Sequence, residues 1–336
     1  MFHCKVSVCC LTYNHEKYLK QALDSIIAQR TNFKYEIIVL DDASKDGTQE
    51  IIKEYCLNYP DLVKSVLQTE NQFSKGVPIV NQIFYPMAKG KYIAYCEGDD
   101  YWTDCLKLQK QADFLDAHPE YVAYSHECWE VDESGNKITD YYFNGCYKQY
   151  YDLKLHCNWQ ILSGQTATLM HRKEGFQVEG KEALEELGKL KITGDVKKTA
   201  ILVLSGPIYH TGKVMSHHRR VYNKGDSWSA STAKDNLRIF YFDALDELEE
   251  YIGQYFGRKI SYEKFKIKMT ITSLYLYLLD RNKEKYDTFK YMYHMVKRYR
   301  FIYFKLMLMF VQLPIVRTEI KISRMKNRHL NKKGRE

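Results

Sequence analysis

The sequence predicts an α/β fold in which helices flank a mostly parallel β-sheet. Two observations favour this class. Short apolar runs alternate with helix-period segments through roughly the first hundred residues, and polar residues directly follow three of these runs. The chain has 336 residues, of which 45% are hydrophobic and 27% charged, so it can form one large domain or two ordinary ones.

The first strands are expected to be short, apolar and bounded by polar residues. In chain order they are residues 6–11, 36–40, 62–67 and 91–96. Segments with apolar side chains at helical spacing separate them: residues 16–28, 48–59 and 77–88. Strands and helices that alternate at this spacing form right-handed βαβ units, so the four strands should lie parallel in one sheet.

Beyond residue 120 the pattern is less regular and then becomes helical. We expect a strand over residues 122–131, a turn at 132–136, and helices over 181–190, 195–204, 235–252, 262–280 and 284–300. The change in composition near residue 235 predicts two domains. The first, residues 1–235, would consist of halves 1–118 and 119–235, and residues 236–336 would form a helical, basic extension.

The net charge of +8 is concentrated at the C-terminus, because residues 281–336 hold 16 Lys and Arg against 4 Asp and Glu. Such a terminus favours an acidic partner or is simply a solvated surface. We expect no nucleic-acid partner, since the chain shows no recognisable nucleic-acid-binding motif. Within this region residues 301–316 are almost wholly apolar. Two hypotheses are open: a segment lying on an anionic membrane, or a helix packed on the protein or on a second copy.

Targeting signals and cysteine usage indicate the compartment. No window reaches 18 uninterrupted apolar residues, and the N-terminus has no basic region followed by an apolar one. Neither a membrane-spanning helix nor a secretory signal is therefore expected. The nine cysteines are an odd number without repeated CxxC spacing, which favours reduced thiols. We expect a cytoplasmic protein, peripheral on the inner face of the plasma membrane if residues 301–316 contact lipid.

Acidic pairs follow two of the predicted strands. Asp41 and Asp42 end the second strand, and Asp99 and Asp100 follow the fourth. Ligands bind at the carboxyl ends of parallel strands, where a cation would offset the repulsion between such pairs. Carboxylates suit Mg²⁺ or Mn²⁺, above all when a diphosphate completes the shell. The chain contains neither a Walker lysine loop nor GxGxxG, so a metal would carry more of the phosphate neutralisation.

Three segments carry a family resemblance: VSVCCLTYN at residues 6–14, EIIVLDDASKDGT at 36–48 and GKYIAYCEGDDYW at 90–102. Together they resemble the nucleotide-sugar-binding half of a family 2 glycosyltransferase with the GT-A fold. The EGDDYW motif resembles a bacterial subgroup that builds surface polysaccharides. A shorter match to the acceptor half comprises Ile192–Asp195 and Met215–Arg219.

The resemblance implies roles for residues of the donor half. Leu11 and Thr12 would line the nucleoside pocket, and Asp42 would accept a hydrogen bond from the base. Asp99 and Asp100 stand at the motif that binds the metal and the donor diphosphate, and one of them would be the direct metal ligand. The first acid of this motif is Glu97 here, where the family usually has Asp.

In the acceptor half, the resemblance makes Asp195 the catalytic base and places Arg219 on a loop that closes over the donor phosphates. The family often has His two residues after this Arg, where Val221 stands here. The candidates to replace it are His217, His218 and Tyr222. Two further candidates rest on residue type and position alone. Lys75 is a candidate contact for the diphosphate, and Trp102, beside the acidic pair, is a candidate to stack on a sugar or to shape the site.

The implied activity is an inverting transfer of a sugar from a nucleoside-diphosphate sugar to a glycan or lipid-linked acceptor, with Mn²⁺ or Mg²⁺, in cell-surface polysaccharide synthesis. Two alternatives remain. A sugar nucleotidyltransferase also uses acidic metal ligands on an α/β sheet, but it usually has a Gly-rich, basic loop after the first strand. A degenerate transferase would instead serve as a binding module for a membrane or an assembly.

Overall fold

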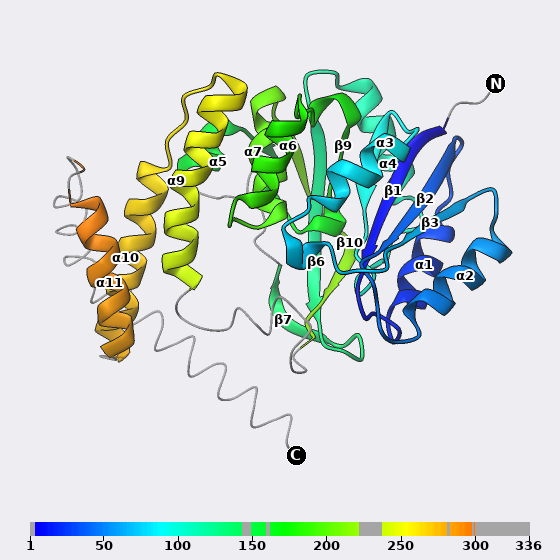
Figure 1. Cartoon of the computed structure of the whole chain (residues 1–336), viewed down its shortest axis with the longest axis horizontal. Coiled ribbons are helices and arrows are strands. Elements are labelled where there is room, and N and C mark those ends of the chain that lie inside the picture. Colours follow the sequence, from blue (N-terminus) through cyan, green and yellow to red (C-terminus); the bar gives the residue numbers. More distant parts are fainter. Residues whose placement is uncertain are drawn as a thin grey trace, which may run out of the picture. The chain divides into compact units, whose positions relative to one another are not determined.

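The computed structural model describes residues 4–142, 149–158, 162–221, 237–280, 283–297 and 299. The chain divides into two compact units, one comprising Met1–Ala233 with Ala244–Ile260 and the other Lys234–Asp243 with Ser261–Glu336. The first unit contains the sheet (Figure 1). The boundary predicted at residue 235 falls among residues outside the described part, and it stays a prediction.

Four parallel strands form one side of the sheet, in the order β3-β2-β1-β4. They are β1 (Cys4–Thr12), β2 (Lys34–Asp41), β3 (Val63–Leu67) and β4 (Tyr92–Tyr95). The helices α1 (Leu19–Ile27) and α2 (Thr48–Asn58) connect the first three strands. These elements confirm the predicted parallel arrangement. Because the chain adds strands first on one side of β1 and then on the other, the point where the order reverses lies between β1 and β4.

The sheet continues beyond β4 with strands of mixed direction, in the order β9-β6-β10-β5. The strand β9 is antiparallel to both β4 and β6, whereas β6 and β10 run parallel to one another. The short strands β5 and β8 pair with β10, and β7 pairs with β6. The bounds are β5 (Tyr101–Trp102), β6 (Ala123–Val131), β7 (Lys137–Tyr142), β8 (Tyr150–Tyr151), β9 (Met170–Arg172) and β10 (Ile208–Arg219). One continuous sheet therefore joins the two predicted halves of the first domain.

The helix predicted over residues 77–88 is present over residues 79–87, but it is not a regular α-helix: a wide π-helical turn, η2 (Val80–Phe84), leads directly into a single α-turn, α3 (Tyr85–Met87). Pro86 has no N–H to donate to the preceding turn, so a regular helix cannot run through this segment. Met215–Arg219, expected on a loop, form the end of the long strand β10.

Five helices agree closely with the predicted ones: α6 (Lys181–Lys189), α7 (Gly194–Ser205), α9 (Leu237–Phe256), α10 (Glu263–Asp280) and α11 (Lys283–Val296). The structure adds the helices α4 (Lys107–Ala117) and α5 (Leu153–Asn158) and the short 3₁₀ turns η1 (Phe73–Lys75), η3 (Thr166–Thr168) and η4 (Lys173–Gly175). In the second unit Phe242, Ile267, Met292 and Val296 form a small buried cluster. The apolar segment 301–316 and the rest of the basic tail lie outside the described residues.

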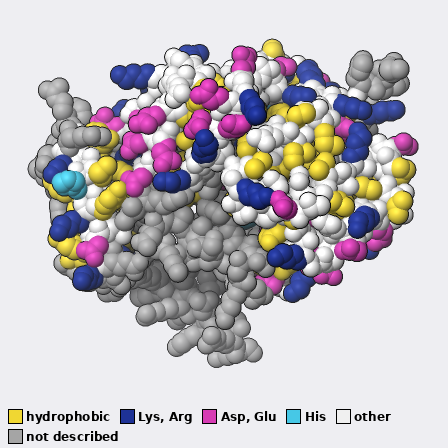
Figure 2. Space-filling view, viewed as in Figure 1, with side chains coloured by type: hydrophobic (Ala, Val, Ile, Leu, Met, Phe, Trp, Pro, Cys, Tyr) yellow, Lys and Arg dark blue, Asp and Glu magenta, His cyan; other side chains and the backbone are white. Residues whose placement is uncertain are grey.

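No helix in the described part of the chain is both long enough and apolar enough to cross a bilayer. On the face seen in Figure 2, basic and acidic side chains are interspersed over the described residues.

A buried polar contact joins β1, β2 and the start of β4. The Ser7 hydroxyl donates to Glu36 (2.7 Å) and accepts from the backbone N–H of Gly90 (2.8 Å). Glu36 also accepts from the Lys64 ammonium (2.6 Å). Gly90 passes so close to β1 that a Cβ would lie 2.4 Å from the Ser7 nitrogen. The fit of β4 against β1 therefore depends on the absence of a side chain at position 90.

We expect Gly90→Ala to lower the free energy of unfolding by about 1–3 kcal/mol, because the added methyl group must displace the backbone of β1. Gly253→Ala, in α9, is the matched control: a Cβ there meets nothing within 4 Å. It should be neutral or stabilising by up to about 1 kcal/mol, since Ala is the better helix former. Denaturant titration of both variants measures the difference, and equal stabilities would contradict this account of the β1–β4 contact.

Candidate donor and catalytic site

The predicted donor residues meet at the carboxyl ends of β1, β2 and β4, next to the point where the strand order reverses. Backbone hydrogen bonds hold these ends together. The N–H of Asp42 donates to the Thr12 carbonyl (3.0 Å), and the N–H of Gly98 donates to the Leu11 carbonyl (2.9 Å). Thr12 is buried and Leu11 is half-buried. The structure therefore brings Leu11, Thr12, Asp42 and the acidic loop to one edge of the sheet.

Asp42 supports the loop that follows β3. Its carboxylate oxygens accept the backbone N–H groups of Gln72 (2.7 Å) and Phe73 (3.0 Å), and its carbonyl accepts from the Asn71 side chain (3.2 Å). Only 3% of Asp42 is exposed. The Asp42 carboxylate thus orders the loop around η1. This role is additional to the hydrogen bond with a nucleobase that the resemblance implies. Lys75, in the same loop, forms an ion pair with Glu70 at the surface.

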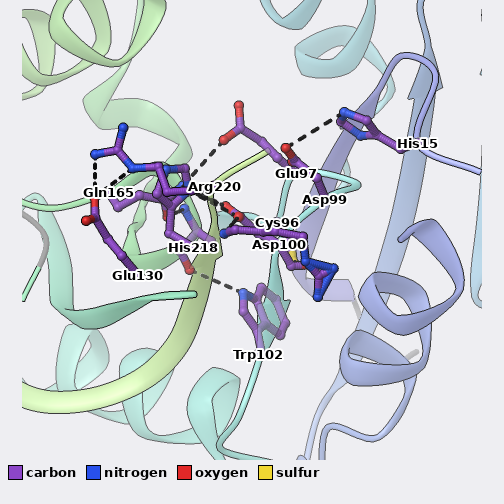
Figure 3. A network of polar contacts seen from close by, with 12 residues as sticks. His15, Cys96, Glu97, Asp99, Asp100, Trp102, Glu130, Gln165, His218 and Arg220 are labelled. Atoms are coloured by element: carbon purple, nitrogen blue, oxygen red, sulfur yellow. Dashed lines mark hydrogen bonds and ion pairs between the residues drawn. The ribbon is translucent and has the colours of Figure 1, made fainter. Parts of the chain in front are cut away.

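Asp100 is the most thoroughly bonded acid of the site. Its Oδ1 accepts the backbone N–H of Arg219 (2.9 Å), and its Oδ2 accepts the side-chain N–H of Gln165 (2.6 Å). His218 Nδ1 lies 3.2 Å from Oδ1. Figure 3 shows Gln165 and His218 converging on this carboxylate. With 1% of the residue exposed, Asp100 joins the end of β4 to β10 and to the segment before η3.

Asp99 differs from its neighbour. Its side chain is 21% exposed, and Nε2 of His15 lies 3.9 Å from the Asp99 carboxylate. Glu97 is half-buried and lies 3.4 Å from the Gln165 amide nitrogen. Asp99 and Glu97 are therefore the acids of this loop with carboxylate positions left for a ligand.

The loop concentrates negative charge in a poorly solvated place. Burial, reinforced by the charges of Asp100 and Asp99, raises the pKa of Glu97 to about 8. Burial likewise raises the pKa of Asp99. Burial alone would lower the pKa of His218, but the charge and hydrogen bond of Asp100 outweigh it and raise this pKa to about 9. The site thus stabilises positive charge, either as protons or as a bound cation.

The donor set suits a hard divalent cation. Among the described residues, no group of three or more His, Cys, Asp or Glu side chains is placed to hold a metal unaided. A carboxylate such as Asp99, with the oxygens of a substrate diphosphate, is the usual set for Mg²⁺ or Mn²⁺. The Asp100 oxygens already accept protein hydrogen bonds, so the geometry favours Asp99 over Asp100 as the direct ligand.

Asp195 lies in the first turn of α7, where its carboxylate accepts the backbone N–H of Val196 (2.8 Å). One turn later the Lys198 ammonium lies over the ring of Tyr95, 3.3 Å from its centroid. Burial lowers the pKa of Lys198, although the charges of Glu97 and Asp195 oppose this shift. Since Tyr95 ends β4, the first turn of α7 approaches the edge that carries the acidic loop.

Arg219 is brought to the same edge but is held by neighbours. Its guanidinium donates to the Gln21 side chain (2.7 Å) and lies 4.6 Å from the ring centroid of Tyr18 and 5.3 Å from that of Tyr101. Its Nε has no hydrogen-bond partner among the described residues. Arg220 instead pairs with Glu130. Of the candidates to replace the missing His, His218 contacts the acidic loop, His217 contacts the Tyr101 hydroxyl (2.9 Å), and Tyr222 lies outside the described residues.

Trp102 is buried directly after the acidic loop in the chain and supports it. It is 4% exposed, donates from its indole to the Ala167 carbonyl (3.2 Å), and has the buried Lys107 ammonium 4.1 Å from its ring centroid. It can shape the site but does not present a face for stacking. Sequence reasoning missed Gln165 and His15. Gln165 lies in a stretch without recognisable pattern, whereas His15 directly follows the polar end of the first strand.

Comparison with known proteins agrees with this geometry. The family described as Glycosyl transferase family 2 matches residues 7–174, half of the chain. An uncharacterized protein of Mycobacterium tuberculosis is 43% identical over 136 residues, which are 40% of this chain and 38% of that protein. The glucosyltransferase WfaP of Escherichia coli is 30% identical over 129 residues, 38% of this chain and 47% of WfaP. The matches span less than half the length of these two relatives.

Solved structures show the same fold. The S. aureus protein TarS, in complex with UDP-GlcNAc, aligns with a TM-score of 0.57 at 18% identity, covering 86% of this chain and 79% of that one. The mannosyltransferase PcManGT of Pyrobaculum calidifontis, in complex with GDP-Man and Mn²⁺, aligns with a TM-score of 0.50 at 17% identity, covering 89% and 76%. The predicted GT-A fold with a C-terminal helical extension is thereby confirmed, and the chain belongs to glycosyltransferase family 2.

Proposed function

We propose that this protein transfers a sugar from a nucleoside-diphosphate sugar to a glycan or lipid-linked acceptor, inverting the anomeric centre. One observation carries the proposal. The acidic loop lies where the strand order reverses, with Asp100 tied to β10 and Asp99 open to a ligand. Family membership favours transfer over the nucleotidyltransferase alternative.

The donor would bind at this edge of the sheet. The loop that Asp42 orders would hold the nucleoside, with Leu11 and Thr12 at the pocket wall. The diphosphate would lie beside Asp99, where Arg219 and His218 supply positive charge. Support comes from the two structural neighbours, which were solved with UDP-GlcNAc and with GDP-Man.

The divalent cation would be held by Asp99, with Glu97 next to it. When bound, it would stabilise the negative charge that grows on the departing diphosphate. The Mn²⁺ ion in the PcManGT complex supports this choice. Asp100 would act as a positioning residue, because its oxygens fix Arg219 and Gln165 around the loop.

Asp195 would serve as the general base. An acceptor hydroxyl is a poor nucleophile near neutral pH, so a carboxylate must accept its proton as it attacks the anomeric carbon. Attack opposite the leaving diphosphate inverts that carbon in one displacement. The cation–π contact of Lys198 with Tyr95 supports this role, because it brings the first turn of α7 to the end of β4.

The acceptor is proposed to be lipid-linked, within the synthesis of a cell-surface polysaccharide. WfaP, by its name, is a glucosyltransferase for a GlcNAc-diphosphoundecaprenol acceptor. A membrane-borne acceptor would suit a cytoplasmic enzyme that lies peripherally on the inner face of the plasma membrane. The basic, partly apolar residues 301–336 are the proposed contact with anionic lipid.

Asp195→Asn should reduce transfer by about 10²–10⁴-fold, since the amide cannot accept the proton of the acceptor. Donor affinity should stay within a few-fold of wild type, because the donor residues belong to other elements. Turnover of donor and its calorimetric affinity are to be measured on both proteins. Glu120→Gln, at an exposed acid paired with His118, is the matched acid-to-amide control. Transfer close to wild type would show that Asp195 only caps α7 and would make Glu179 or Glu186 the candidate base.

Asp99→Asn and Asp100→Asn should distinguish a residue that binds the cation from one that holds the acidic loop in place. Asp99→Asn should abolish the effect of Mn²⁺ on donor affinity and leave the melting temperature unchanged or slightly higher, because it removes one repulsive charge. Asp100→Asn should weaken donor binding and also lower stability by about 1–3 kcal/mol, since its amide group faces the Gln165 and His218 donors. Thermal unfolding and donor titration with and without Mn²⁺ test both; unchanged metal dependence in Asp99→Asn would contradict the ligand assignment.

The 336-residue chain should sediment with vesicles containing anionic phospholipid at low salt and be released as salt rises. Screening weakens the attraction between the basic tail and the lipid surface, where each Lys or Arg contributes about 1 kcal/mol. Vesicles of neutral phosphatidylcholine are the control. A protein that stays in the supernatant with anionic vesicles at low salt would contradict the peripheral location.

A further inference from the structure

His15 has no role so far, yet its side chain faces the acidic loop. Its Nε2 lies 3.9 Å from the Asp99 carboxylate, and Figure 3 shows the ring turned toward that loop. This distance is too long for a direct hydrogen bond. Both side chains keep about one fifth of their surface exposed, 23% for His15 and 21% for Asp99, so a ligand can reach the gap between them.

The imidazole is held in this place by the surrounding backbone. The His15 N–H donates to the Thr48 hydroxyl (2.9 Å), and its carbonyl accepts the N–H groups of Tyr18 and Leu19 at the start of α1. On the other side the ring packs against Gly98, where a Cβ would lie 2.8 Å from His15 Nδ1. These contacts fix the backbone at His15 and place its ring between Gly98 and the Asp99 carboxylate.

Two buried polar atoms around Gly98 have no hydrogen-bond partner among the described residues. They are His15 Nδ1 and Thr12 Oγ1, and Thr12 is only 1% exposed. The Thr12 oxygen would lie 2.7 Å from a Cβ at position 98, so both atoms border the same loop. Unpartnered buried polar atoms call for an explanation such as an ion or ordered water. Both atoms face Gly98 and not the gap to Asp99, so the case for a ligand rests on His15 Nε2 and the Asp99 carboxylate.

We propose that His15 supplies Nε2 as a second protein ligand to the divalent cation beside Asp99, which rests on the function proposed above. Two atoms that each lie about 2 Å from one ion can be up to about 4 Å apart, as these two are. An imidazole ligand favours transition-metal ions such as Mn²⁺ and Co²⁺ over Mg²⁺, which prefers oxygen. His15 would thus set the metal preference of the enzyme.

The proposal also predicts the order of binding. Since the described residues offer no cluster of three metal-binding side chains, His15 and Asp99 alone should hold Mn²⁺ weakly. The oxygens of the nucleoside diphosphate would complete the shell. Mn²⁺ affinity should therefore rise strongly when UDP or GDP is present.

Isothermal titration of UDP and GDP, in Mn²⁺, in Mg²⁺ and in EDTA, tests this inference without any turnover. Wild type should bind one nucleotide more tightly in Mn²⁺ than in Mg²⁺. His15→Ala should lose about tenfold or more of the Mn²⁺-supported affinity and little of the affinity in EDTA. His15→Gln, which keeps an oxygen ligand, should retain Mg²⁺-supported binding but lose the preference for Mn²⁺. His118→Ala, an exposed histidine paired with Glu120, is the matched control and should behave as wild type.

Two outcomes would overturn the role of His15 while leaving the proposed function intact. Either the ratio of Mn²⁺ to Mg²⁺ affinities is unchanged in both His15 variants, or the affinity falls equally in EDTA, which would place His15 on the phosphates instead of the ion. A third outcome is different in kind. If wild type binds neither of these nucleotides nor ADP, CDP or dTDP with any metal, the proposed function fails together with this inference.

Discussion

The buried carboxylate of Asp100 is the interaction on which the site depends. It accepts a backbone N–H from Arg219 and a side-chain N–H from Gln165, while His218 lies beside it. These three residues come from segments more than sixty positions away in the chain. One side chain thus fixes the acidic loop of the donor half against β10 and the segment before η3.

This use of Asp100 determines what its neighbours can do. Because Asp100 is committed to protein donors, Asp99 and Glu97 remain as the acids that can meet a ligand. Burial, reinforced by the charge of Asp100, raises the pKa of both, so positive charge beside this loop would be stabilised, as the proposed cation requires. His15 and His218 border the same loop, with ring nitrogens 3.9 Å from Asp99 and 3.2 Å from Asp100. The buried negative charge of the acidic loop therefore underlies both the hydrogen bonds that hold Asp100 and the cation binding proposed for Asp99.

The sequence predicted the parallel half of the sheet well, because apolar runs and helical stripes are local signals. It also placed the acidic loop at the ligand-binding edge, since strand order implies where carboxyl ends meet. Pro86 could have warned against a regular helix over residues 77–88. β10 was missed because its run of His and Arg residues does not look like a strand, and pairing with β6 stabilises it. Gln165 and the support of the 71–76 loop by Asp42 were not predictable, since only the folded chain brings these partners together.

A crystal structure of the protein with Mn²⁺ and the nucleoside diphosphate that binds it would test the central claim most directly. We predict an anomalous Mn²⁺ signal within bonding distance of the Asp99 carboxylate and of the diphosphate, with Asp100 still bonded to Arg219 and Gln165. A nucleotide bound at another edge of the sheet, or Mn²⁺ ligated by Asp100 in place of its hydrogen bonds to β10, would contradict the account.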